Sequence, residues 1–292
     1  MHRAISLSVR TSIIAVAIAT LGWLLGLVFP PDPVAEQARG VVGRIGLPLV
    51  SALLLAAPLA FPIGRSRLSG NALLGPVFLA VFGLTTVLTQ VESAVFLDMT
   101  TRALLVETLK LTITAAALSW LAVALYPRLP TALPEVSRGP NPPTPASWVR
   151  RWAAVSVAYV VLYVAAGLSI LPVIQPWYEA QGTLDPNLAL LFPLQLARGA
   201  LFVAFVIPLL RSMRVTRWQA SAAMAFLIPL MHGVAALIQP NPFMPDYVRH
   251  AHLVEIGWSN FVLGLLIGFL FWNPSPRVSR ADRATDVRHG GT

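Results

Sequence analysis

The stretch LALLFPLQLARGALFVAFVIPLL (188–210), followed by RSMRVTR (211–217) and WQASAAMAFLIPLMHGVAALI (218–238), decides the fold. Each of the two apolar runs has about 20 residues, enough to cross the hydrocarbon core of a bilayer as a helix. The segment between them is short and carries three arginines. Short Arg-rich loops are typical of the cytoplasmic side of multi-pass membrane proteins. We therefore expect two antiparallel transmembrane helices joined inside the cell.

The composition of the whole chain extends this prediction. Of the 292 residues, 56% are hydrophobic and 11% are charged, whereas a soluble domain carries roughly 25% charged residues. One soluble core of this length cannot bury so much apolar surface, so much of it must face lipid. The absence of cysteine excludes disulfides, thiolate metal sites and cysteine nucleophiles.

The same alternation of apolar runs and polar breaks continues in both directions from this segment. Eight apolar stretches can span a bilayer. They run roughly over residues 11–30, 45–63, 72–92, 103–126, 152–173, 188–210, 218–238 and 251–272. Proline, glycine or charged residues separate them. The sequence therefore predicts an all-α fold, a polytopic membrane bundle of about eight transmembrane helices.

The distribution of basic residues predicts the orientation. With the N-terminus inside, 15 arginines fall on the inner side of the eight spans and 4 on the outer side, while Lys110 and Arg198 lie within spans. This asymmetry alternates through every loop, so we expect both termini in the cytoplasm of a bacterial cell and the chain in the cytoplasmic membrane. It also accounts for the net charge of +9 without nucleic acid as a partner.

The chain divides into two halves at a proline-rich connection. Residues 1–126 form a first four-helix half, and residues 127–150 form an extended cytoplasmic linker. Residues 151–273 form the second four-helix half, and residues 274–292 form a basic, disordered cytoplasmic tail.

Polar residues inside the spans are the best functional clues, because a charge that faces lipid costs at least a few kcal/mol. They gather in the outer half of the membrane or near its middle, which favours a shared pocket that opens outward. The candidate ligand-binding residues are Arg198, Gln195, His232, Glu255, His252, Asn260, Ser259, Glu107 and Lys110.

Arg198 is the strongest single candidate. It lies about 15 Å into its helix at 1.5 Å per residue, and its guanidinium stays protonated. It therefore needs a carboxylate, and we expect Glu255 to supply it. Such a pair could be structural and fix helix packing, or Arg198 could hold the carboxylate or phosphate of a ligand.

The other candidates leave alternatives open. Glu107 and Lys110 are three residues apart and can pair on their own helix near the interface. His232, His252 and Glu255 form an incomplete zinc ligand set without an HExxH motif, so we expect no metal site. Two GxxxG motifs, at Gly22 and at Gly264, are expected to serve packing within the fold.

The eight-helix count with membrane-embedded Glu and His resembles the CAAX-protease and bacteriocin-processing family of intramembrane proteases. That family carries an EExxxR motif, but neither Glu92 nor Glu107 is followed by a second glutamate. Neither His232 nor His252 has the family's partner residue four positions away. The segments LQLARGALF (194–202) and HLVEIGWSNFVLG (252–264) are instead similar to segments of uncharacterised bacterial multi-pass membrane proteins, a similarity that implies no activity.

Three functions remain open. The leading hypothesis is binding or transport of a small polar or anionic solute, or of a lipid headgroup, with Arg198 holding the anion. The second is a membrane-embedded, metal-dependent hydrolase that uses His232, His252 and Glu255. The third is a structural or assembly subunit of a membrane complex. No cofactor can be named from the sequence.

The topology can be tested by cysteine labelling, because the chain has no cysteine of its own. We expect Gly182→Cys to react with a membrane-impermeant thiol reagent added outside intact cells, and Gly139→Cys to be protected. The reverse result would contradict the predicted orientation.

Overall fold

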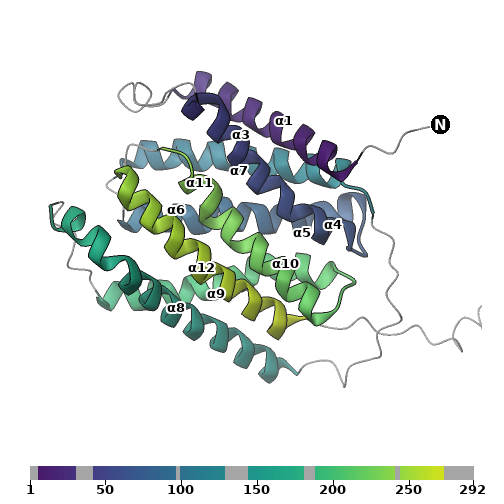
Figure 1. Cartoon of the computed structure of the whole chain (residues 1–292). Helices are drawn as coiled ribbons and strands as arrows, with labels where there is room; N and C mark the ends of the chain where they lie inside the picture. The colour runs from purple at the N-terminus through teal and green to yellow at the C-terminus, as the bar shows by residue number, and fades with distance from the viewer. Residues whose placement is uncertain are drawn as a thin grey trace, which may run out of the picture.

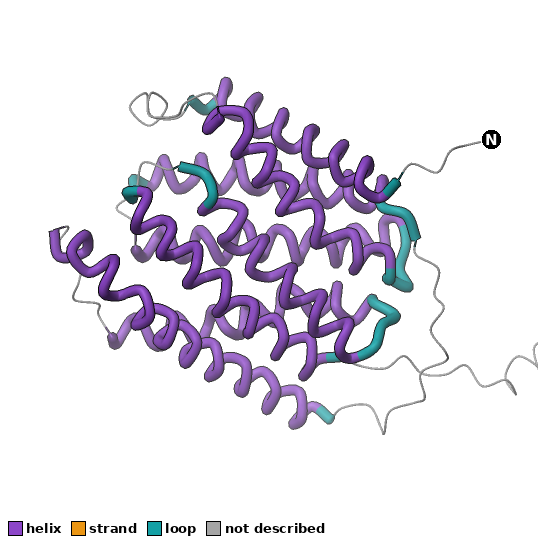
Figure 2. The backbone as a smooth tube through the Cα atoms, viewed as in Figure 1, coloured by secondary structure: helices purple, strands orange, loops and turns teal. Residues whose placement is uncertain are grey.

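The computed structural model describes residues 6–30, 42–96, 99–128, 144–180, 188–240 and 244–272. Within these ranges the chain is helical, contains no β-sheet, and has eight helical segments long and apolar enough to cross a membrane (Figures 1 and 2). The prediction of an all-α, multi-pass membrane fold with about eight spans is confirmed. The orientation in the membrane stays a prediction.

Five of the spans are single helices and three are assembled from shorter helical pieces. The single helices are α1 (Leu7–Val28), α7 (Thr101–Leu125), α8 (Pro145–Ala180), α9 (Leu188–Ser212) and α12 (Asp246–Phe271). Helix α9 contains two prolines without a break. The assembled spans are η1, α3, η2 and α4 (Val42–Gly46, Leu47–Ala56, Ala57–Leu59, Ala60–Gly64); α5, η3 and α6 (Gly70–Phe82, Gly83–Val87, Leu88–Phe96); and α10, η4 and α11 (Arg217–Pro229, Leu230–Val234, Ala235–Leu237).

The fifth span differs most from its expected bounds. Helix α8 begins at Pro145 and has 36 residues, so residues 145–150 of the expected linker are helical. Its first turns pack on the end of α12, where the Trp148 ring lies 5.3 Å from the Phe271 ring and Arg151 donates to the Leu270 carbonyl at 2.7 Å. These contacts extend the helix beyond its apolar part. Residues 129–143 of the expected linker and the C-terminal tail lie outside the described residues.

The helices form one layered bundle with α8 at one edge and α1 at the opposite edge (Figure 1). In the first half of the chain, α1 packs on α3 and α7, and α5 packs on α7. In the second half, α12 lies between α10 and α8, and α8 also packs on α9. The halves meet where α5 contacts α9 and η3 contacts η4. The Ser51 hydroxyl of α3 adds a hydrogen bond to the Ala235 carbonyl of α11 at 2.6 Å.

The two GxxxG motifs have different environments. A Cβ added at Gly264 or Gly268 would lie 2.4 Å from a backbone atom of α10, so these glycines allow α12 and α10 to approach closely. The expectation of packing within the fold is confirmed for this motif. At Gly22 and Gly26 nothing lies within 4 Å of an added Cβ. The same expectation is wrong there, because this face of α1 has no helical neighbour among the described residues.

Arginines at one end of the bundle donate hydrogen bonds to carbonyls at or just beyond the C-terminal ends of neighbouring spans. The pairs are Arg10 to Leu125, Arg67 to Arg211, Arg128 to Ser66 and Arg151 to Leu270. Carbonyls in the last turn of a helix have no partner within the helix and carry partial negative charge, so a guanidinium stabilises them. These arginines belong to the predicted cytoplasmic side. They therefore hold the spans together, in addition to the effect on topology that the sequence predicts.

The contact between α10 and α12 predicts an asymmetric response to enlarging the glycines. Gly264→Val should lower the thermal stability of the detergent-solubilised protein, since overpacking costs typically 1–3 kcal/mol and the α10 backbone cannot move aside. Gly26→Val, in the same kind of motif but with open space around it, should leave the stability unchanged. Equal losses in the two variants would show that the α10–α12 approach is not as close as described.

Candidate functional site

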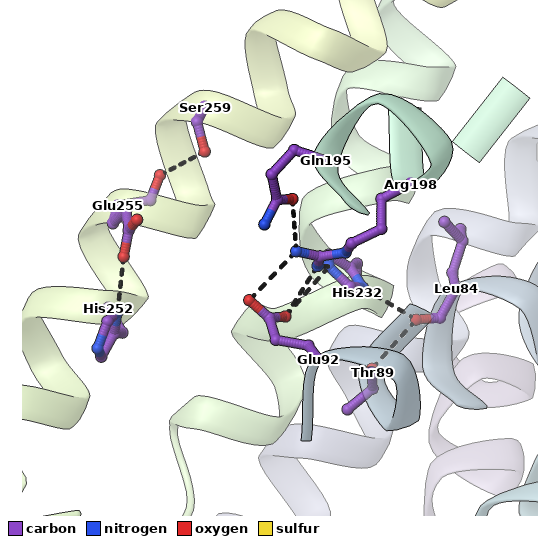
Figure 3. A network of polar contacts seen from close by, with 9 residues as sticks. All are labelled: Leu84, Thr89, Glu92, Gln195, Arg198, His232, His252, Glu255 and Ser259. Carbon is purple, nitrogen blue, oxygen red and sulfur yellow. Dashed lines mark hydrogen bonds and ion pairs between the residues drawn. The ribbon is translucent and has the colours of Figure 1, made fainter. Parts of the chain in front are cut away.

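Arg198 lies at the centre of a buried polar network (Figure 3). Its side chain is 1% exposed, and its Nη2 donates to Oε2 of Glu92 at 2.9 Å. A longer contact of 3.4 Å joins its Nη1 to the other carboxylate oxygen of Glu92. The two oxygens of Glu92 thus face the two terminal nitrogens of the guanidinium, which is the bidentate arrangement that binds carboxylates most strongly. This network joins α9 to α6.

The expected partner of Arg198 was Glu255, and that expectation is wrong. The third span continues to Phe96 instead of ending near residue 92, so Glu92 lies a full turn inside the helix. The carboxylate of Glu255 bonds Nδ1 of His252 at 2.6 Å instead. Sequence reasoning missed Glu92 because the span predicted over residues 72–92 ends at this residue.

His232 completes the network and is fixed in one protonation state. Its Nε2 lies 3.2 Å from Nη2 of Arg198, and its Nδ1 lies 3.1 Å from the carbonyl oxygen of Leu84. A guanidinium only donates hydrogen bonds and a carbonyl only accepts them. Nε2 must therefore accept and Nδ1 must carry the proton, so these contacts hold His232 as a neutral imidazole. The expected proximity of His232 to Arg198 is confirmed.

His232 and Leu84, whose carbonyl accepts its proton, both lie in π-helical turns. His232 belongs to η4 and Leu84 to η3, and each turn interrupts a span. An added Cβ at Gly83 would overlap the Phe205 ring, and one at Gly233 would lie 2.5 Å from Ile256. Glycine at these positions therefore lets neighbouring side chains close on the turns. Single π-helical turns occur frequently at functional sites.

Two hydrogen-bond donors in the network have no partner among the described residues. Gln195, one turn before Arg198 on α9, accepts from Nη1 of Arg198 at 2.9 Å through its Oε1. Its Nε2 and the Nε of Arg198 are buried without a hydrogen bond in the described part of the chain. A buried donor left unpaired costs about 1–3 kcal/mol. An acceptor supplied from outside the chain would recover that free energy.

The Tyr159 ring of helix α8 packs against the Arg198 guanidinium. The Arg198 guanidinium carbon lies 5.6 Å from the centre of the Tyr159 ring, within cation–π range. This close approach depends on Gly199, where an added Cβ would lie 2.8 Å from the Ser156 backbone. Sequence reasoning did not identify Tyr159, whose position in an apolar run resembles an ordinary packing residue.

A second polar group lies on α12, facing the C-terminal half of α8. Nδ1 of His252 bonds Glu255, and its Nε2 lies 3.2 Å from the hydroxyl of Tyr178. Ser259 donates to the backbone carbonyl of Glu255 at 2.7 Å, and Asn260 is buried one residue further along. The structure thus places four of the candidate residues in this group, while Gln195 and His232 join Arg198.

Glu107 and Lys110 form a separate pair. Nζ of Lys110 lies 2.7 Å from Oε1 of Glu107, and their side chains are 23% and 41% exposed. The expected alternative, in which they pair on their own helix, is confirmed. This pair lies outside the Arg198 network.

The residues of the metal-dependent hypothesis are divided between the two groups. His232 is bonded to Arg198 and Leu84, whereas His252 and Glu255 bond each other. In the described ranges no three His, Asp or Glu side chains come together as a metal site. Comparisons of the chain with family models, with curated proteins and with solved structures found no match. The geometry of the site is therefore the only basis for a proposed function.

The exposure of the ion pair predicts unequal effects of removing its two partners. Glu92→Ala leaves a buried guanidinium uncompensated and should cost roughly 3–5 kcal/mol. Arg198→Met leaves Glu92, which is 32% exposed and can turn toward water, so the loss should be smaller. The double variant should recover part of the loss, with a coupling of roughly 0.5–3 kcal/mol in a thermal-stability cycle.

The matched control for this cycle pairs Arg198→Met with Glu255→Ala. Because Glu255 bonds His252 and not Arg198, these two effects should add within about 0.5 kcal/mol. A strong coupling of Arg198 to Glu255, with none to Glu92, would contradict the described network.

Proposed function

We propose that the protein binds, and carries across the membrane, a small solute with an anionic group, which Arg198 and Gln195 hold. A carboxylate and a phosphate are the chemical classes that a buried guanidinium recognises best. The same chemistry can come from a free solute or from a lipid headgroup. One observation carries the proposal: a fully buried cation is covered by a partly exposed carboxylate, with unfilled donors behind it.

Glu92 acts as the replaceable cover of the site. The Arg198 side chain is 1% exposed, whereas the Glu92 side chain that faces it is 32% exposed. An anion that approaches the guanidinium from outside the bundle must therefore take the place of Glu92. The exchange preserves the charge balance at Arg198, because one negative group replaces another. It also offers an acceptor to the unfilled donors of Gln195 and Arg198.

Transport is favoured over binding alone by the helices that carry the site. The third and seventh spans each change helix type at the network, in η3 and η4. Single π-helical turns occur frequently at functional sites, and we infer that these two let parts of the bundle move during transport. The close contacts of Gly83 with Phe205 and of Gly233 with Ile256 lie at these same turns.

Neutralising the cover residue distinguishes a binding site from a structural ion pair. In Glu92→Gln the carboxylate no longer competes for Arg198, so the affinity for acetate, succinate or inorganic phosphate should rise by about tenfold or more. The anion should also raise the unfolding temperature of this variant more than that of the original protein. Isothermal titration calorimetry and thermal unfolding in detergent measure the two effects.

The control is Glu107→Gln, which neutralises another carboxylate within a span but leaves Arg198 untouched. Its anion affinity should equal that of the original protein. If Glu92→Gln only loses stability and none of the three anions binds or stabilises it, the Arg198–Glu92 pair is structural and the proposal fails. Repeating the unfolding measurement in nanodiscs with and without phosphatidylglycerol separates a lipid headgroup from a free solute.

A further inference from the structure

The second polar group contains a carboxylate that the first group does not contact. Arg198 and Glu92 compensate each other, and His232 is held neutral by its contacts. Glu255 faces no Lys or Arg within ion-pair distance in the described part of the chain, and its only ion-pair partner there is His252. A carboxylate inside a membrane span needs polar partners, and a cationic group of a ligand can be one of them.

One oxygen of Glu255 remains open. Its Oε2 bonds His252, whereas its Oε1 has no hydrogen-bond partner among the residues that the structure describes. Oε1 lies opposite Gly167 of α8, where an added Cβ would stand 4.0 Å away. A carboxylate oxygen without a hydrogen-bond partner is an acceptor for the N–H groups of a cation.

The two polar groups share one face of α8. Tyr159, Tyr163 and Gly167 follow each other at intervals of four residues on this helix, so they lie on one stripe. Arg198 packs over the Tyr159 ring and Glu255 lies beside Gly167. Tyr163 comes between them on the stripe, and its ring centre lies 6.5 Å from that of Tyr159. A molecule that lies along this stripe would meet the guanidinium at one end and the open carboxylate at the other.

From this juxtaposition we infer that the ligand is a small zwitterion, whose anionic group binds Arg198 and Gln195 while its ammonium group binds Oε1 of Glu255. The inference rests on the proposed function and names the class of its substrate. The rings of Tyr159 and Tyr163 between the two charges suit a short aliphatic chain, and aromatic faces also attract an ammonium group. An ω-amino acid and a phosphoethanolamine headgroup both have this chemistry.

The experiment compares linear ω-amino acids, from glycine to 6-aminohexanoate, with their N-acetyl derivatives by calorimetry on the full chain in detergent. Acetylation removes the ammonium charge and keeps the carboxylate. We expect one or more of the zwitterions to bind about tenfold or more tightly than its N-acetyl derivative, a difference of about 1.4 kcal/mol. Glu255→Gln should abolish this preference, and Glu255→Asp should retain part of it. Glu107→Gln should leave it unchanged.

The possible failures can be told apart. If zwitterions and N-acetyl derivatives bind equally, or if Glu255→Gln keeps the preference, the zwitterion inference is overturned while the anion site at Arg198 stands. If no compound binds even in Glu92→Gln, the proposed function fails and this inference fails with it. Phosphoethanolamine that binds in phosphatidylglycerol nanodiscs but is excluded in phosphatidylethanolamine nanodiscs would support the inference and identify the lipid headgroup as the source.

Discussion

The permanent charge of Arg198 in the interior of an apolar bundle is the constraint on which the rest of the site depends. A guanidinium cannot lose its proton to escape the cost of burial, so the surrounding helices must supply a carboxylate, acceptors and a polarisable surface. Glu92 from α6, Gln195 from α9 and Tyr159 from α8 meet these needs. His232 fits the remaining space only as a neutral acceptor. The π-helical turns and close glycine contacts hold these groups in register.

The spans were predictable because the hydrophobic requirement of a bilayer is local and continuous along the sequence. The partners were not, because pairing depends on depth and rotation of each helix about its axis. The third span extends one turn beyond its predicted end, so Glu92 lies inside the helix and pairs with Arg198. Glu255 pairs with His252 instead. The two GxxxG motifs likewise do not reveal which neighbour each one faces. Gly264 packs against α10 and Gly22 packs against nothing described, although the motif is identical.

The two ends of the bundle differ in their carboxylates. At one end, arginines bind carbonyls at the C-terminal ends of neighbouring spans and fix the helices to one another. Toward the other end, Arg249 binds the Leu237 carbonyl of α11 in the same way, but two carboxylates lie there as well. Glu92 pairs with Arg198 and is partly exposed, and Glu255 pairs with His252. The proposed exchange of a ligand at Arg198 depends on the partial exposure of Glu92.

The central claim is that Glu92 is the removable counter-ion of Arg198. An experimental structure of the chain in nanodiscs, determined with and without a bound ligand, tests it most directly. Without ligand, the account predicts the Glu92 carboxylate within hydrogen-bond distance of Arg198, at about 2.7–3.2 Å. With ligand, the ligand's anionic oxygens should occupy that position and Glu92 should have turned away. A ligand bound elsewhere while Glu92 stays on Arg198, or an Arg198 that pairs with Glu255, would contradict the account.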